Sequence, residues 1–130
     1  SCIENKRVIL IDDSIVRGTT ASKIVKMVYE AGAKEVHLGI SCPPIKHPDF
    51  YGIDTPNYDE LIASKSNIEE MTNLVGAKSL FFLSLNGTYK AMGCKERNNK
   101  LPQFTDHCFT GEYPIDVSEI LKINSTNVKK

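Results

Sequence analysis

Two neighbouring carboxylates and a short polar segment lie close together near the start of this chain of 130 residues. Asp12 and Asp13 come first, and residues 14–20, S-I-V-R-G-T-T, follow them. Hydroxyl side chains and backbone N–H groups bind phosphate. A pair of carboxylates beside a phosphate would repel it unless the pair faces sugar hydroxyls, a divalent cation such as Mg²⁺, or both. The pattern therefore predicts a site for a phosphorylated pentose with Mg²⁺.

Two predicted elements must hold these groups in place. The unbroken apolar run V-I-L-I at 8–11 predicts a strand that is buried on both faces of a parallel sheet. Residues 21–31 predict an amphipathic helix, whose apolar face carries Ile24, Val25, Met27, Val28 and Ala31. The acids then lie at the carboxyl end of a parallel strand, where open α/β sheets bind ligands. The backbone N–H groups of residues 17–20 become unpaired donors at the start of the helix.

The same residues have a simpler interpretation. Asp12 and Asp13 could do no more than cap the following helix, with Thr19 and Thr20 in a turn. An acid near a helix N-terminus stabilises it by only about 0.3–1 kcal/mol, and such residues are common there. The combination of an apolar strand, two acids and a loop that ends in G-T-T favours the binding site over the cap.

The rest of the chain predicts further α/β structure. A second strand over 35–41 completes a βαβ unit, so the first two strands are expected to be parallel. Four prolines exclude ordinary helix or central strand from 42–58, and this segment is expected to pack as a loop over the site. Capping-box patterns that begin at Asn57 and Ser66 predict helices over 58–63 and 67–75. Further elements are expected as a third buried strand over 79–85, a helical turn over 88–92 and a short helix near Val117.

The composition excludes several other classes of protein. Sixteen basic and sixteen acidic residues give a formal net charge of zero, and no basic cluster of the kind that binds nucleic acid is present. No run of 18 apolar residues indicates a membrane span, so we expect a cytoplasmic protein. The four cysteines are scattered and form no C-x-x-C pair, and free thiols are expected at Cys2, Cys42, Cys94 and Cys108.

The stretch I-L-I-D-D-S-I-V-R-G-T-T resembles the phosphoribosyl pyrophosphate signature of type I phosphoribosyltransferases. Its S-I-V-R-G-T-T part is similar to that of the amidophosphoribosyltransferases, the glutamine-dependent enzymes that open purine synthesis. The similarity continues through E-A-G-A-K-E-V-H (30–37), P-P-I-K-H-P-D-F-Y-G-I-D (43–54), D-E-L-I-A (59–63) and C-F-T-G-E-Y-P (108–114).

The resemblance implies a Rossmann-like parallel sheet of the type I phosphoribosyltransferase fold, with only its C-terminal portion present. Residues 1–94 are expected to form the C-terminal half of that domain, and 95–130 a C-terminal extension. The family converts phosphoribosyl pyrophosphate and ammonia from glutamine to 5-phosphoribosylamine and pyrophosphate. Its glutaminase domain precedes this region, so the resemblance implies a fragment that is inactive alone, carries no catalytic residue and belongs to a homo-oligomer.

The resemblance also implies roles for individual residues. Phosphoribosyl pyrophosphate, or a purine nucleotide that inhibits in its place, is expected to contact Asp12, Asp13, Ser14, Val16, Arg17, Gly18, Thr19 and Thr20. Asp12 and Asp13 are also expected to bind Mg²⁺. Asp54 either lies near the incoming amine or caps the turn at Thr55-Pro56, and both roles stay open.

Cofactor binding is the point at which the sequence departs from part of the family. One branch holds an iron–sulfur cluster through cysteines, and Asp49 and Thr105 stand where two of these cysteines would be. Only Cys108 is kept, and a cluster usually needs four thiolates. No iron–sulfur cluster is expected, and neither His37 nor His47 has a partner at metal-ligand spacing.

A receiver domain of a response regulator is the alternative from another class. Such a domain also begins with a strand that ends in D-D-S, and it carries a phosphorylated Asp about forty residues later, the place of Asp54. Ser84 fits the Ser at the end of a later strand. Against this reading, the segment around Asp54 is broken by prolines and cannot be an apolar strand.

Overall fold

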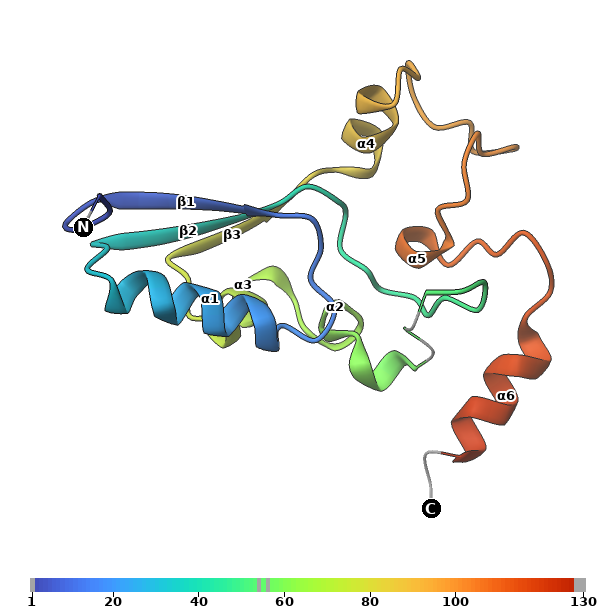
Figure 1. The fold of residues 1–130 in the computed structure, drawn as a ribbon. Coiled ribbons are helices and arrows are strands. Elements are labelled where there is room, and N and C mark those ends of the chain that lie inside the picture. Colours follow the sequence, from blue (N-terminus) through green and yellow to red (C-terminus); the bar gives the residue numbers. More distant parts are fainter. Residues whose placement is uncertain (1, 54, 56, 128–130) are drawn as a thin grey trace.

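A parallel three-stranded sheet forms the centre of the fold. The computed structural model describes residues 2–53, 55 and 57–127. The sheet has the order β1-β2-β3 (Figure 1), with β1 at Arg7–Asp12, β2 at Glu35–Ile40 and β3 at Ser79–Phe82. The helices are α1 (Thr19–Glu30), η1 (Tyr58–Glu60), α2 (Ile62–Lys65), α3 (Ile68–Val75), α4 (Leu85–Ala91), α5 (His107–Thr110) and α6 (Ser118–Asn127).

The parallel βαβ arrangement is confirmed. Arg7 pairs with Glu35 and Asp12 with Ile40, so β1 and β2 end together. β3 continues the sheet on the far side of β2, with Phe82 beside Ile40. All three strands therefore bring their carboxyl ends to one edge of the sheet, the edge from which the loop after Asp12 departs (Figure 1).

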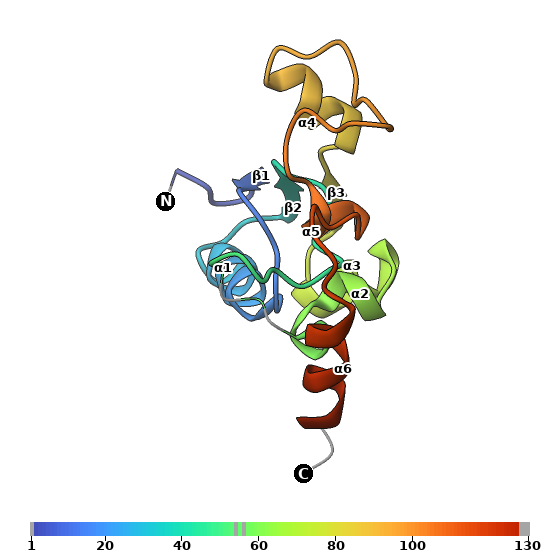
Figure 2. The same cartoon turned by 90° about the vertical axis from the view of Figure 1, so that its right-hand side faces the viewer.

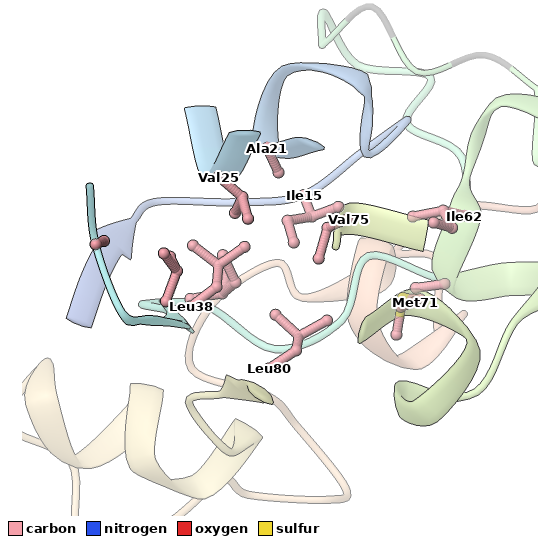
Figure 3. Packing of buried hydrophobic residues seen from close by; sticks show 12 residues of the cluster. Ile15, Ala21, Val25, Leu38, Ile62, Met71, Val75 and Leu80 are labelled. Carbon is pink, nitrogen blue, oxygen red and sulfur yellow. The ribbon is translucent and has the colours of Figure 1, made fainter. Parts of the chain in front are cut away.

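Helices α1 and α3 cover one face of the sheet, and the core lies between them and the strands (Figure 3). Val25, Val36 and Val75 are each at most 1% exposed there. The prediction that the run 8–11 is buried on both faces is wrong, because Ile9 and Ile11 are 65% and 68% exposed. Among the described residues the helices next to the strands lie on one face only, so alternate side chains of β1 point away from the core (Figure 1).

Helix α1 places a narrower stripe against the sheet than its sequence suggests. Ala21 and Val25 are buried and Val28 packs against the core, which is the spacing of four and three residues expected for one helical face. Ile24 and Met27 lie at the edges of the stripe and are 38% and 65% exposed. The broad face expected to include them is therefore only partly buried.

Two of the predicted boundaries are wrong for a reason of local hydrogen bonding. The strand expected over 79–85 ends at Phe82, because Ser84 caps α4 by accepting a hydrogen bond from the N–H of Gly87 at 3.0 Å. The capping box of α3 begins one residue later than expected. Its partners are Asn67 and Glu70, which exchange two hydrogen bonds of 2.9 Å.

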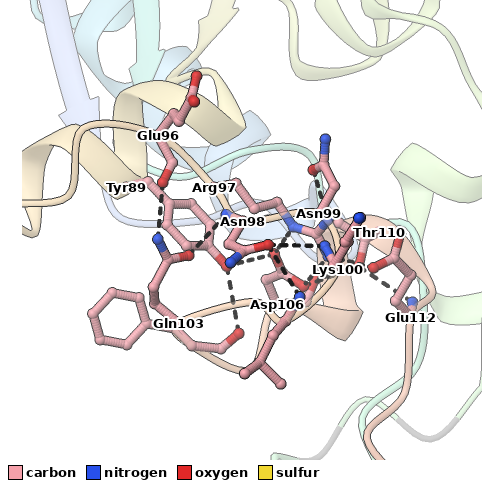
Figure 4. A network of polar contacts seen from close by, with 12 residues as sticks. Tyr89, Glu96, Arg97, Asn98, Asn99, Lys100, Gln103, Asp106, Thr110 and Glu112 are labelled. Atoms are coloured by element: carbon pink, nitrogen blue, oxygen red, sulfur yellow. Dashed lines mark hydrogen bonds and ion pairs between the residues drawn. The ribbon is translucent and has the colours of Figure 1, made fainter.

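The segment after α4 is held by a buried polar network around Arg97 (Figure 4). The guanidinium donates to both carboxylate oxygens of Asp106, at 2.6 and 3.2 Å, and forms an ion pair with Glu112. Tyr89 on α4 donates to the same carboxylate at 2.8 Å. Burial by itself would raise the pKa of Asp106. The hydrogen bonds from Arg97 and Tyr89 outweigh this effect and bring the pKa below its ordinary value, so the carboxyl group is ionised.

The C-terminal part of the chain also contacts the proline-rich segment. The N–H groups of Lys46 and His47 both donate to the carbonyl of Cys108, at 2.9 and 3.0 Å. In the turned view, α4 lies on the opposite side of the sheet from α1 and α3 (Figure 2). The chain from α5 onwards runs past the carboxyl edge of the sheet (Figure 1). Residues after the third strand therefore pack around the same edge as the loop after Asp12.

Candidate functional site

The end of β1 is fixed to the neighbouring strand. Both the N–H and the hydroxyl of Ser41 donate to the carbonyl of Asp12, at 2.9 and 3.1 Å. Asp12 is partly buried and Asp13 is exposed. One oxygen of Asp12 accepts the N–H of Asp13 and one oxygen of Asp13 accepts the hydroxyl of Ser14, each at 2.9 Å. Among the described residues, each carboxylate keeps one oxygen without a protein donor, which leaves it for a ligand.

The loop after the acids is held in place by the core and by contacts with η1 and α2. Ile15 is 3% exposed and belongs to the core, although the polar residues Asp13 and Ser14 come directly before it. The carbonyl of Val16 accepts the N–H of Ile62 at 2.9 Å, which fastens the loop to α2. Arg17 forms an ion pair with Glu60 of η1. These contacts fix the middle of the loop and hold its backbone in one path.

The N-terminus of α1 offers backbone donors without protein partners. Gly18 is the N-cap residue, and no side chain caps the helix. In the described part of the chain, no residue accepts a hydrogen bond from the N–H groups of residues 17–20. α3, by contrast, is capped by Asn67. Free N–H groups with the positive end of the helix dipole form a seat for an anion such as phosphate.

The acids and the donors share one cavity. Its volume is about 300 Å³, and its lining consists of residues 12–21. The structure therefore brings together the predicted site residues Asp12, Asp13, Ser14, Val16, Arg17, Gly18, Thr19 and Thr20. Asp54, the remaining predicted site residue, lies outside the described residues. Thr19 and Thr20 are exposed, so their hydroxyls can add donors to the phosphate seat.

Sequence reasoning missed the residues that support the loop. Ser41 follows the second strand, and the rule that parallel strands end at one edge could have placed it beside Asp12. Glu60 and Ile62 come from a separate segment more than forty residues later, and only the tertiary structure brings them to the loop. No local pattern in the sequence indicates these two contacts.

Gly18 is a position where a side chain is expected to disturb both the fold and the site. Its φ is 76°, and an added Cβ would lie 3.2 Å from Ile62 Cδ1 and 3.2 Å from Leu74 Cδ2. Gly76 has almost the same φ, 75°, with nothing within 4 Å. Gly76→Ala should therefore lower the free energy of unfolding by about 1–2 kcal/mol, the energy of placing a non-glycine residue in the left-handed conformation.

Gly18→Ala should cost roughly 1 kcal/mol more than Gly76→Ala because of this crowding. It should also weaken phosphate binding about tenfold, by displacing the loop amides. Urea unfolding and calorimetric titration with ribose 5-phosphate check the two variants in parallel. Equal losses of stability and unchanged binding in both variants would show that the loop tolerates a side chain at this position.

Cys42 lies beside the acid pair. Burial, and then the negative charge of Asp13, raise the pKa of its thiol to about 11. Only a thiolate is alkylated at a useful rate, so at pH 8 Cys42 should react with iodoacetamide at least tenfold more slowly than the exposed Cys2. Peptide mapping of a time course measures both rates. Equal rates would mean that Cys42 is open to water and that the charge of Asp13 does not raise the pKa of its thiol.

No helix in the described ranges is long and apolar enough to cross a membrane. All four cysteines are free, as expected. No protein-family model matches the chain.

The chain is similar to curated proteins named amidophosphoribosyltransferase. It is 59% identical over 113 residues to the one from Rhizobium etli, covering 86% of this chain and 23% of that protein. The Bacillus subtilis protein is 52% identical over 88% of this chain and 24% of its own length. The Methanocaldococcus jannaschii protein is 50% identical over 91% of this chain and 24% of its own length.

Solved structures give the same result. The glutamine phosphoribosylpyrophosphate amidotransferase of Bacillus subtilis, complexed with ADP and GMP, matches with a TM-score of 0.80 and 51% identity over 90% of this chain. A structure described as the allosteric regulatory enzyme of purine biosynthesis matches with a TM-score of 0.80 and 50% identity. The chain spans about a quarter of the length of these relatives.

Proposed function

Because this chain is related in sequence and in structure to a segment of the amidophosphoribosyltransferases, we propose that it forms the phosphoribosyl pyrophosphate site of such an enzyme. One observation carries the proposal. The free oxygens of Asp12 and Asp13 and the unpaired N–H groups at the start of α1 line the same cavity of about 300 Å³. A pentose 5-phosphate has a diol at one end and a phosphate at the other, which matches this division.

The side chains and amides divide the ligand between them. The N–H groups of residues 17–20 and the hydroxyls of Thr19 and Thr20 hold the 5′-phosphate. The carboxylates of Asp12 and Asp13 accept hydrogen bonds from the ribose hydroxyls, and hydrogen bonds to a charged acceptor are stronger than those between neutral groups. Ser14 and Val16 also line the cavity. These residues orient the sugar and do not react with it, so their contribution to catalysis is alignment.

Mg²⁺ fits the donor set at the acids, because both residues present carboxylate oxygens, the ligands that this ion prefers. We infer that Asp12 and Asp13 hold it. When bound, the ion supplies positive charge that neutralises the pyrophosphate as it leaves. The chain's own task is to hold that ion beside the sugar and away from the phosphate seat.

The complete enzyme's reaction lies beyond this segment and is part of the proposal. The polypeptide that contains the chain converts phosphoribosyl pyrophosphate and glutamine-derived ammonia to 5-phosphoribosylamine and pyrophosphate in the cytoplasm, as a homo-oligomer. A glutaminase domain outside this segment supplies the ammonia, so the segment alone is inactive. The division between a sheet-bearing part at 1–94 and an extension at 95–130 stays a prediction, and the bond from Tyr89 to Asp106 crosses it.

Purine nucleotides are the second class of ligand that we propose for the cavity. They carry the same 5′-phosphoribosyl group, so the loop amides and the acids can hold them in the same way. The related Bacillus subtilis structure is complexed with ADP and GMP, which supports a nucleotide site in this segment. The comparisons give no support to the receiver-domain alternative, whose acceptor Asp54 lies outside the described residues.

We also infer that this chain holds no iron–sulfur cluster. Asp49 and Cys108 do lie close together, with 3.8 Å between Oδ2 and Sγ. The third member of this group is His107, so the group has only one thiol. A cluster needs about four thiolates, and the donor set does not fit. Iron and acid-labile sulfide in stoichiometric amounts in the purified enzyme would overturn this inference.

Isothermal titration calorimetry tests the proposed function. Phosphoribosyl pyrophosphate with Mg²⁺ should bind once per chain, and affinity should fall at least tenfold when EDTA replaces the metal. Pyrophosphate with Mg²⁺ should bind more weakly, because it lacks the diol and the 5′-phosphate that the cavity recognises. If pyrophosphate bound more tightly than ribose 5-phosphate, the ligand site would not be this cavity.

A further inference from the structure

A second cavity, of about 380 Å³, lies between the proline-rich segment and α5. Asp49, His107 and Cys108 line it. One carboxylate oxygen, one imidazole nitrogen and the thiol sulfur of this trio all lie within 4.8 Å of one another. We propose that these three side chains bind a single divalent transition-metal ion, zinc, independently of the phosphoribosyl site.

The chemistry of the trio selects the class of metal. Nitrogen, oxygen and sulfur together suit zinc and its neighbours, whereas Mg²⁺ and Ca²⁺ take oxygen alone. Bonds of about 2.0–2.3 Å in a tetrahedral site place ligand atoms roughly 3.3–3.8 Å apart. The separation of Asp49 Oδ2 from Cys108 Sγ is 3.8 Å, already at that spacing. His107 Nε2 lies 2.7 Å from the same oxygen and would move out by roughly half an ångström.

The carboxylate is fixed in advance. Oδ1 of Asp49 accepts the N–H groups of Tyr51 and Ile53, at 2.8 and 2.9 Å, and this leaves Oδ2 for the trio. Asp49 is only 5% exposed. Hydrogen bonds of this kind to the second oxygen are what orient carboxylate ligands in metal sites. The site therefore does not depend on the metal for the position of its charged ligand.

The imidazole of His107 is buried and lies against two aromatic rings. His107 is 5% exposed, and Tyr51 and Tyr113 lie against its ring with centroid distances of 4.9 and 5.1 Å. Nε2 bonds to Asp49, but the buried Nδ1 has no hydrogen-bond partner in the part of the chain that the structure describes. A buried nitrogen without a partner costs about 1–3 kcal/mol. A metal bound to Nε2 would leave Nδ1 unpaired, so the site is recognised by the spacing of its three ligand atoms.

The backbone brings the ligands together without the metal. The carbonyl of Cys108 accepts the N–H groups of Lys46 and His47, and the hydroxyl of Tyr113 donates to the carbonyl of Pro48 at 2.8 Å. These bonds hold the two segments at ligand distance. The cavity leaves room for water or another group as a fourth ligand. A bound ion would cross-link residues 49 and 107–108, far apart in the sequence.

Cobalt substitution tests the site in the complete purified polypeptide after removal of metals with a chelator. One equivalent of Co²⁺ should produce a thiolate-to-cobalt charge-transfer band, and one equivalent of Zn²⁺ should abolish it. Cys108→Ser should lose the band, and Asp49→Asn should weaken binding at least tenfold. Cys94→Ser, which removes another half-buried thiol, should keep the band.

A thermal melt gives a second readout that does not rely on colour. Zn²⁺ should raise the melting temperature of the wild type and of Cys94→Ser but not of Cys108→Ser, because only a folded site binds it. Absence of a charge-transfer band in the wild type would overturn the proposal. So would a band that survives Cys108→Ser. If Asp49→Asn does not fold, Cys108→Ser still decides, since its side chain is of similar size and half-buried.

Discussion

Replacing Asp12 and Asp13 together by asparagine should reduce Mg²⁺-dependent binding of phosphoribosyl pyrophosphate at least about a hundredfold. One oxygen of each carboxylate accepts a hydrogen bond from the next residue in the chain, and the other oxygen is left for the ligand. Hydrogen bonds to charged groups contribute about 1.5–3 kcal/mol each, so the loss of two amounts to a factor of about 10²–10⁴. Calorimetric titration at fixed Mg²⁺ measures it.

The same variant should behave differently toward phosphate alone. Ribose 5-phosphate without Mg²⁺ places its phosphate on the loop amides, which the substitution leaves in place. Removal of two negative charges beside that seat should leave phosphate affinity unchanged or raise it. Asp59→Asn serves as the control, because Asp59 is an exposed carboxylate paired with Lys65 at 2.6 Å and lies outside the cavity lining.

A loss of affinity in Asp59→Asn as large as in the double variant would place the metal elsewhere. The affinity for phosphoribosyl pyrophosphate with Mg²⁺ and the affinity for ribose 5-phosphate without Mg²⁺ could instead fall equally. That result would mean that the acids hold the loop in place and do not contact the sugar. The asparagines keep the size of the side chains, so the unfolding midpoint should change little. It should be measured alongside.

Arg97→Met should lower the free energy of unfolding by about 3–5 kcal/mol, the cost of leaving a buried charge without its partner. The side chains of Arg97 and Asp106 are only 6% and 5% exposed. Removal of the guanidinium leaves the buried Asp106 carboxylate without its ion-pair partner. The hydrogen bonds from Arg97 and Tyr89 hold the pKa of this group below its ordinary value, although burial acts in the opposite direction. Urea unfolding followed by circular dichroism checks the loss.

Two further variants separate charge from packing at this network. Lys95→Met changes an exposed residue two positions away and should alter stability by less than about 0.5 kcal/mol. Arg97→Met/Asp106→Leu removes both charges and should recover part of the loss, since an apolar pair of similar volume can replace a buried ion pair. A double variant less stable than Arg97→Met would show that the network stabilises through its shape and its bonds to Tyr89.

The sequence allowed the chemistry of the loop to be predicted because the relevant residues are contiguous. The strand, the acids and G-T-T lie within fourteen positions, and local rules place them at one sheet edge. The exposure of Ile9 and Ile11 could not be predicted, because an apolar run reads the same whether one or both faces of a sheet are covered. Periodicity reports the chain's own pattern and not the neighbours it meets.

Contacts between distant segments were the other limit. Glu60 meets Arg17, and His107 meets Asp49, across separations of 43 and 58 residues. Nothing near His107 marks it as a partner, because its neighbours form a four-residue helix without a periodic pattern. In the sequence, Asp49 is marked only by standing where part of the family has a cysteine. Its role as an acceptor of two backbone N–H groups became visible only in three dimensions.

The most direct test of the central claim is an amide NMR titration of the polypeptide with ribose 5-phosphate. The backbone ¹⁵N–¹H resonances of Arg17, Gly18, Thr19 and Thr20 should shift most, with movement to lower field as they donate to the phosphate. The amides of α3, whose N-terminus is already capped by Asn67, should stay in place. Saturable binding that leaves the four loop amides unmoved would contradict the account.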